Sequence, residues 1–233
     1  MEIKSTKFSA ARLFFTAVYI LIFPALILLL AGDWLWIEGW IFDILFIALC
    51  STTIIYLYRH DPALLTERYK QPGSGGQRGW DRYVVYALVL VFMLWIVIMP
   101  LDAKRFGWSP GFPLWAKIVG GLLLALSSLL FFRSFADNSF VSPLVRVQAE
   151  RGQTVVSTGV YGFVRHPMYL GGILLFFGAP ILLGSLYGIL IGALVSLLLA
   201  ARIIGEEKML VKELKGYTDY RKKVKYRLIP FVW

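Results

Sequence analysis

The chain alternates between long apolar runs and shorter polar segments that are rich in basic residues. A hydrocarbon core of about 30 Å requires about 20 apolar residues in a helix. Six runs reach or nearly reach this length: 12–31, 36–58, 83–101, 113–135, 168–184 and 186–205. The last two are short and meet at Gly184-Ser185, as in a tight helical hairpin. The pattern therefore predicts about six transmembrane helices.

Composition supports a membrane protein. Hydrophobic residues make up 58% of the 233 residues and charged residues only 16%, whereas soluble domains are about half apolar and about a quarter charged. Disordered, collagen and coiled-coil classes are excluded. The first apolar run is too long for a signal peptide, and no small-residue cleavage site follows, so we expect it to be retained. A single cysteine, Cys50, excludes an internal disulfide framework, and only two histidines argue against a metal site.

The basic residues predict how the spans face. With the N-terminus in the cytoplasm, 21 of the 24 Lys and Arg residues lie inside, all except Lys104, Arg105 and Lys117. Cytoplasmic segments of membrane proteins carry such an excess. We therefore expect both termini in the cytoplasm, in a bacterial inner membrane or the endoplasmic reticulum. The net charge of +10 then reflects this rule and attraction to anionic lipid head groups, and not nucleic-acid binding.

The predicted inner segments are long, so the chemistry is expected at the cytoplasmic face. We interpret residues 1–233 as one membrane domain, with N-terminal spans in 1–135 and the functional region in 136–233. The glycine-rich run 71–76 lacks the Gly-x-Gly-x-x-Gly spacing and follows no strand, which argues against a Rossmann domain. Small residues recur every four positions from Gly184 to Ala200 and predict close packing against a neighbouring helix.

The first group of candidate functional residues surrounds the start of the fifth span. Val155-Val156 is typical of a short extended strand, and the turn 157–159 follows it. Pro167 suits the first position of a helix. Arg165 and His166 then lie at a helix N-terminus, which favours an anionic ligand group. The alternative is an interfacial anchor that binds lipid phosphate.

The second group lies near the end of the sixth span. Arg202 and Glu206 are four residues apart and share a helix face, so a simple ion pair is one interpretation. However, Arg202 stands at the edge of an apolar helix, where ionisable groups are often functional. Beyond the Glu206-Glu207 pair, apolar residues predict one amphipathic surface helix, broken near Gly216: Leu210, Leu214, Tyr217 and Val224.

In order along the chain, these motifs resemble a known family. They read Gly159-x-Tyr161-x-x-x-Arg165-His166-Pro167-x-Tyr169-x-Gly171, Arg202-x-x-x-Glu206-Glu207-x-x-Leu210, Tyr217-x-x-Tyr220 and Ile229-Pro230. These motifs resemble those of the isoprenylcysteine carboxyl methyltransferase family, and the resemblance covers about the last 100 residues. Membrane phospholipid N-methyltransferases share part of it. The resemblance implies an all-α membrane enzyme that uses S-adenosylmethionine and has no Rossmann domain.

The resemblance also implies roles for particular residues. Those implied for the cofactor are Gln148, Gln153, Thr154, Val155, Val156, Tyr161, His166, Pro167, Met168, Tyr169 and Glu206. The spacing of Gln148 differs from the family, and many relatives have histidine at the position of Gln153. Arg202 matches the arginine that the family places at the substrate carboxylate. We assign Arg202 and Glu207 as catalytic, Arg202 and Arg165 as substrate-binding, and no metal ligands.

The expected reaction is O-methylation of a carboxylate on a lipid-like or isoprenoid acceptor, either a small molecule or a prenylated protein. A carboxylate is already ionised at neutral pH and needs no general base, and an arginine can hold it. An amine acceptor would need a base, for which His166 or Glu207 are candidates. The alternatives are a phospholipid or amine N-methyltransferase, a sterol-reductase-like membrane enzyme, and a non-enzymatic membrane protein. The expected partners are this acceptor and membrane lipids, and not nucleic acid.

Overall fold

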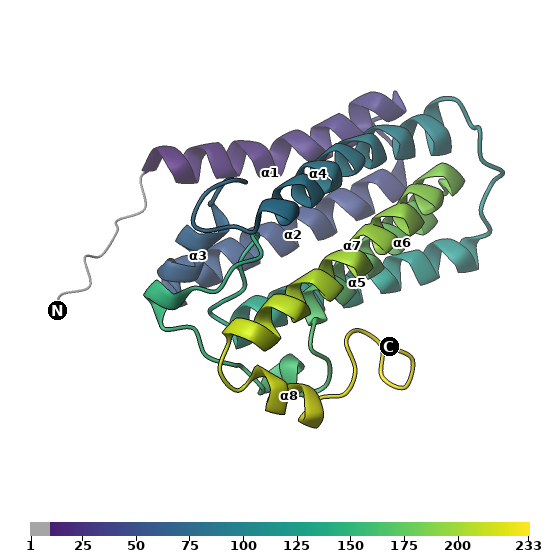
Figure 1. The fold of residues 1–233 in the computed structure, drawn as a ribbon. Coiled ribbons are helices and arrows are strands. Elements are labelled where there is room, and N and C mark those ends of the chain that lie inside the picture. Colours follow the sequence, from purple (N-terminus) through teal and green to yellow (C-terminus); the bar gives the residue numbers. More distant parts are fainter. Residues whose placement is uncertain (1–9) are drawn as a thin grey trace.

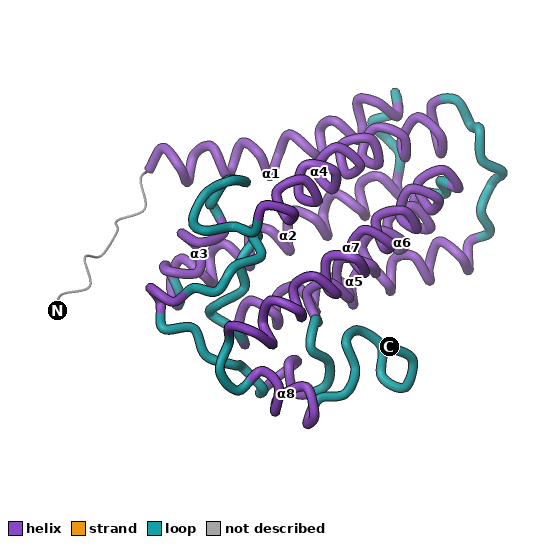
Figure 2. The backbone as a smooth tube through the Cα atoms, in the orientation of Figure 1, coloured by secondary structure: helices purple, strands orange, loops and turns teal. Residues whose placement is uncertain are grey.

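Helices form all the regular secondary structure in the part of the chain that the computed structural model describes, residues 10–233 (Figures 1 and 2). Lys4 and Lys7, on which the predicted inward placement of the N-terminus partly rests, lie outside the described residues. In chain order the elements are α1 (Ala10–Ala31), α2 (Ile37–His60), α3 (Pro62–Arg68), α4 (Gly79–Pro100), a π-helical turn η1 (Leu101–Arg105), α5 (Leu114–Asp137), two 3-10 turns η2 (Ala149–Arg151) and η3 (Gly159–Gly162), α6 (Pro167–Leu183), α7 (Leu186–Glu213) and α8 (Tyr217–Lys223).

The architecture is that of an integral membrane protein, as predicted. Five helices are long and apolar enough to span a bilayer, namely α1, α2, α4 with its π-helical turn, α5 and α7. The predicted fifth span corresponds to α6, which is apolar but has only 17 residues. The all-helical membrane fold is thus confirmed, whereas the count of six spans stays a prediction.

The long helices and α6 run side by side as one bundle (Figure 1). Close packing of α6 against its neighbours depends on glycines. A Cβ atom at Gly120 of α5 would collide with the backbone of Gly178 and Leu182 in α6. A Cβ atom at Gly192 of α7 would collide with the backbone of Phe176. The small residues predicted to allow close helix packing therefore do so along α7, and the position of α6 is tightly fixed.

The extended strand predicted at Val155-Val156 is a loop, because no second strand in the described chain lies beside it to complete a ladder (Figure 2). The break predicted near Gly216 is confirmed, but the part before it is the end of the sixth-span helix and not a separate surface helix. The sixth-span helix, α7, continues to Glu213, and α8 begins after Gly216, whose φ of 85° is a left-handed conformation that glycine adopts readily.

The apolar residues predicted on that one surface helix nevertheless meet. Leu210 and Leu214 from the α7 end pack with Tyr217 and Val224 in one buried cluster. This cluster holds α8 against the loop between α5 and α6. That loop, α3 and α8 gather at the end of the bundle where α2 ends and α4 begins (Figure 1).

Candidate active site

A pocket lies at this end of the bundle, between the loop after α5, the start of α6, the last turns of α7, and α8. The space within it, including its open mouth, is about 780 Å³. The residues that line it are Asn138, Phe140, Val141, Ser142, Leu144, Val145, Arg146, Gln153, Thr154, Val155, Val156, Tyr161, Arg165, His166, Met168, Tyr169, Arg202, Glu206, Leu210, Leu214, Tyr217 and Tyr220.

Most residues predicted to bind cofactor or substrate are brought together in this pocket. Three of the predicted site residues are not among those that line it: Gln148, Pro167 and Glu207. Gln148 is fully buried and shapes the loop instead, because its amide nitrogen donates to the carbonyl of Phe140 and its amide oxygen accepts from Arg151. Pro167 occupies the first position of α6, as predicted.

The start of α6 positions two side chains in the pocket. His166 precedes the helix, and its ring lies beside the ring of Tyr169, with centroids 5.6 Å apart. The Tyr169 hydroxyl donates to Glu206 at 2.6 Å. A carboxylate and two rings therefore share one wall, which suits a cationic ligand group.

Glu207 lies behind this wall and contacts the side chains of two arginines and one histidine. Its carboxylate accepts from Arg165 Nε at 2.6 Å and from Arg227 Nε at 2.9 Å, and His166 Nε2 lies 3.2 Å away. Arg165 also donates to the carbonyls of Val224 and Lys225. Glu207 thus ties α6, α7 and the C-terminal segment together, and its place fits a residue that orients His166. Its predicted catalytic role stays a prediction.

Arg202 pairs with Asp81. It does not pair with Glu206, which is the partner that the four-residue spacing on α7 would predict. Its Nε donates to Asp81 Oδ1 at 2.7 Å and its Nη2 to Oδ2 at 3.3 Å, while Nη2 also reaches the carbonyl of Pro143. Both side chains are buried. Asp81 belongs to the first turn of α4, so the N-terminal half of the chain positions a key side chain of the pocket.

A second guanidinium, that of Arg68 in α3, lies near Arg202. It stacks over the ring of Phe135, 4.9 Å from its centroid, and its buried Nη1 has no hydrogen-bond partner among the described residues. Burial lowers the pKa of Arg68 to about 10, and the charge of Arg202 contributes to the same shift. The α3 residues Leu64 and Leu65 pack with Tyr161 of the pocket wall. Arg68 thus adds positive charge near Arg202 and the pocket residues Tyr161 and Tyr169, although it does not itself line the pocket.

The loop that roofs the pocket is anchored to α3. Glu67 accepts two hydrogen bonds from Arg146, at 2.9 and 2.8 Å, and one from Ser142. At the other end of the loop, Asp137 accepts from the backbone N–H of Val160 and lies where a side chain on residue 159 would be. Only glycine fits at that position, and its φ is 57°.

The anchor at Glu67 should weaken in acid. Burial alone would raise the pKa of this carboxyl, but hydrogen bonds from Arg146, Lys70 and Ser142 hold it at about 2, below its ordinary value of 4.5. The anchor then stabilises the fold fully above pH 4.5 and is lost as the pH falls toward 2. We expect Glu67→Gln to cost about 3 kcal/mol near neutral pH, and the difference from wild type to shrink over this window. Thermal unfolding as a function of pH measures it, and a constant difference would contradict the assignment.

Sequence reasoning missed Asp81, Glu67 and Arg68, all of which lie in the half of the chain that was interpreted as spans. Asp81 and Glu67 are acidic residues in strongly basic segments beside apolar runs. An acidic residue in a basic segment was the available signal, but it does not indicate which residue the carboxylate pairs with. Tyr217 and Tyr220 were noted as part of the resemblance and not as pocket residues.

Comparisons with known proteins find similar methyltransferases. The family model for phospholipid methyltransferases matches residues 115–216. A protein-S-isoprenylcysteine O-methyltransferase B from Arabidopsis thaliana is 28% identical over 146 residues, which cover 62% of this chain and 70% of the relative. A protein-S-isoprenylcysteine O-methyltransferase from Schizosaccharomyces pombe is 36% identical over 91 residues, 38% of each chain.

The solved structure of a eukaryotic intramembrane Ras methyltransferase, an isoprenylcysteine carboxyl methyltransferase, shares the fold. The TM-score is 0.58 at 21% identity, and the match covers 93% of this chain and 75% of that one. The chain is thus similar, in sequence and in fold, to the isoprenylcysteine carboxyl methyltransferase family. This methyltransferase is therefore a membrane enzyme, and the family resemblance found in its C-terminal motifs is confirmed.

Proposed function

We propose that this methyltransferase transfers the methyl group of S-adenosylmethionine to the carboxylate of a lipid-like, isoprenoid-bearing acceptor at the cytoplasmic face of its membrane. Two relatives are named for O-methylation of isoprenylcysteine, which supports a carboxylate next to an isoprenoid chain. The acceptor is apolar for most of its length, so it reaches the pocket from the bilayer.

The charge of the inner side of the site carries the proposal. Arg202 and Arg68 lie near each other, Asp81 balances one of them, and Arg68 has no carboxylate bound to it among the described residues. A buried charge without a counter-ion is costly, so an anionic group on the acceptor stabilises this arrangement. An amine acceptor, which is cationic before it loses a proton, would be repelled there.

The residues present fit S-adenosylmethionine, which supplies a methyl group on a cationic sulfonium when bound. Glu206 and the face of Tyr169 suit a cationic group. The Tyr217 hydroxyl lines the pocket, is buried and has no partner among the described residues. The loop backbone at 153–156 adds further polar groups along the wall.

The chain's own residues then contribute mainly by positioning. A carboxylate acceptor is ionised at neutral pH, so no residue needs to remove a proton. Arg202 is held by Asp81 at two atoms and can direct its remaining N–H groups to the acceptor. Correct placement of two reacting groups supplies a large share of the rate enhancement of such a transfer.

The second candidate function is N-methylation of a lipid amine, because the matching family model is that of phospholipid methyltransferases. This reaction needs a base. His166 is the nearest candidate, but its Nε2 lies against Glu207 and its surroundings include Arg165. The carboxylate acceptor therefore agrees better with the charges of the site.

The two faces of the site should respond to different substitutions. Glu206→Gln keeps the shape of the side chain and removes its charge, so we expect the affinity for S-adenosylmethionine to fall about tenfold. Arg68→Gln and Arg202→Lys should leave that affinity within about twofold and lower kcat/KM for an isoprenylcysteine acceptor by about tenfold to a thousandfold, as loss of a charge-assisted hydrogen bond of about 1.5–3 kcal/mol with some positioning implies. Calorimetry and a methyl-transfer assay measure the two effects.

The same assay separates the candidate functions. An acceptor whose carboxylate is replaced by an amide should not be methylated. Methylation of a phosphatidylethanolamine head group, and no methylation of any carboxylate, would favour the amine alternative. Equal losses of cofactor affinity in Glu206→Gln, Arg68→Gln and Arg202→Lys would contradict the division of the site.

The orientation of the bundle is part of the proposal. We expect a reporter fused after Trp233 to lie in the cytoplasm and one inserted after Asp33, between α1 and α2, to lie on the other side, because the basic residues favour the side of the pocket. Alkaline phosphatase and green fluorescent protein fusions give opposite signals at the two positions. A C-terminal fusion that reports outside would reverse the orientation and place the pocket away from cytosolic cofactor.

A further inference from the structure

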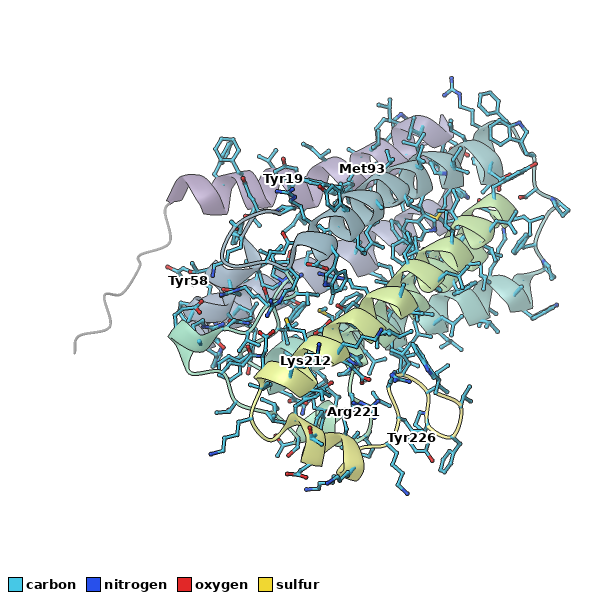
Figure 3. All side chains as sticks on the ribbon, viewed as in Figure 1. Tyr19, Tyr58, Met93, Lys212, Arg221 and Tyr226 are labelled. Carbon is cyan, nitrogen blue, oxygen red and sulfur yellow. The ribbon has the colours of Figure 1, made fainter. Side chains whose placement is uncertain are left out.

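Beyond the pocket, a second set of residues forms a basic hollow beside α8. Two adjoining depressions make it up. One is lined by Ile204, Glu207, Lys208, Val211, Lys212, Arg221 and Arg227, and the other by Arg165, Thr218, Arg221, Lys222, Lys225 and Arg227. They share Arg221 and Arg227, so they form one continuous surface, here called the basic hollow. Figure 3 shows Lys212 on α7, Arg221 on α8 and Tyr226 on the C-terminal segment.

Only some cations of the basic hollow have an anionic partner among the described residues: Arg165 and Arg227 pair with Glu207, and Lys222 pairs with the exposed Asp219. Glu207 is the only acidic residue that lines it, and its carboxylate is engaged by Arg165, His166 and Arg227. Lys208, Lys212 and Arg221 form no ion pair or hydrogen bond with a described residue through their side chains. An anion with several acceptor oxygens would accept hydrogen bonds from these side chains and balance their charge. Phosphate is the group that Lys and Arg clusters bind best.

An apolar face of α7 leads directly into the basic hollow. Leu190, Leu194, Leu197 and Ile204 are exposed, by 59, 48, 70 and 42%. Ala201 is exposed between them and Lys208 follows, so the spacing of three and four residues continues along one helix face. Because α7 spans the membrane, this face contacts lipid chains. A lipid whose chains lie along this face of α7 would therefore have its phosphate head group in the basic hollow.

From this arrangement we propose that the basic hollow binds the phosphate head group of an anionic phospholipid whose acyl chains lie along α7. The site is separate from the methyl-transfer pocket, since the two share only Arg165 among their lining residues. Basic clusters directly beside a membrane span attract anionic head groups, and a soluble phosphate would gain nothing from the apolar face of α7.

Native mass spectrometry of the full chain in neutral detergent tests the proposal with phosphatidylglycerol and phosphatidylcholine of equal chain length. We expect wild type to retain phosphatidylglycerol about tenfold more strongly. K208Q/K212Q should lower that affinity about tenfold. K215Q/K223Q removes the same charge from exposed positions outside the basic hollow and should change it less than about threefold. K208R/K212R should retain it.

Three outcomes overturn the proposal. The first is an equal loss in K208Q/K212Q and K215Q/K223Q, which would show only diffuse surface attraction. The second is displacement of the lipid by excess glycerol 1-phosphate, which would show a soluble phosphate site. The third is the absence of any preference for phosphatidylglycerol.

Unchanged S-adenosylmethionine binding in K208Q/K212Q verifies folding. Should that variant not fold, Arg221→Gln with Lys223→Gln as its control makes the same comparison. These readouts measure no methyl transfer, so they stand apart from the proposed reaction.

Discussion

Replacing Glu207 by glutamine is expected to lower both the stability of the protein and its affinity for S-adenosylmethionine. The side chain is 3% exposed and its carboxylate holds Arg165, His166 and Arg227. Glutamine removes the negative charge and leaves a buried arginine without a counter-ion, which costs about 3–5 kcal/mol. His166 loses the group that fixes its ring, so the affinity should fall at least about tenfold, measured well below the unfolding temperature of both proteins.

Glu213→Gln is the matched control, because it makes the same change at the end of the same helix. Glu213 pairs with Arg78, but both side chains are 40% exposed, and such a pair contributes less than about 1 kcal/mol. Thermal unfolding and calorimetry should therefore distinguish the two variants clearly. If both lose similar stability and neither loses cofactor affinity, Glu207 does not orient the site.

Replacing Asp81 by asparagine is expected to produce the second large effect. Asp81 is fully buried and accepts from Arg202, from the backbone N–H of Val145 and from Gln77. Without its charge, Arg202 loses the carboxylate that pairs with it and remains near the charged Arg68. We expect a loss of about 3–5 kcal/mol in stability and a fall of about a hundredfold in kcat/KM for the acceptor, about 2.7 kcal/mol in the transition state.

A double substitution separates the structural and the functional part of this effect. D81L/R202M replaces the buried pair with apolar side chains of similar size and should recover most of the stability. It should not recover activity, because the acceptor loses its guanidinium. Asp219→Asn, in an exposed pair with Lys222, is the control and should change neither quantity measurably. Recovery of activity in the double variant would remove Arg202 from the acceptor site.

Local patterns explain what the sequence could predict. The apolar runs are long and regular, so the bundle followed from them. Pro167 marks the start of α6 by its missing N–H, and the residues from Tyr161 to Tyr169 follow one another closely enough to share one wall of the pocket. The side of α7 that faces the pocket followed from the four-residue spacing of Arg202 and Glu206.

Long-range polar pairs explain what the sequence could not predict. Asp81 and Arg202 are 121 residues apart, and Glu67 and Arg146 are 79 apart. The two partners of an ion pair do not lie at a regular spacing along the sequence. From the sequence alone, a nearby residue such as Glu206 is therefore the simpler expectation for Arg202. The buried, two-point contact with Asp81 prevails because it satisfies both side chains at once. The division at residue 135 also hid how much the first half of the chain contributes to the pocket.

Because α6 is short, it affects how deep in the bilayer the pocket residues at its start lie. Its 17 residues measure about 26 Å as an α-helix, less than a hydrocarbon core of about 30 Å. With Gly184 at one boundary of that core, Pro167 lies about 4 Å inside the other, and any tilt of the helix increases this depth. Glycine contacts with α5 prevent α6 from sliding to correct the mismatch. In the predicted six-span arrangement, His166 and Tyr169 thus lie below the level of the lipid head groups. The polar end of the proposed isoprenoid acceptor would meet them there without leaving the bilayer.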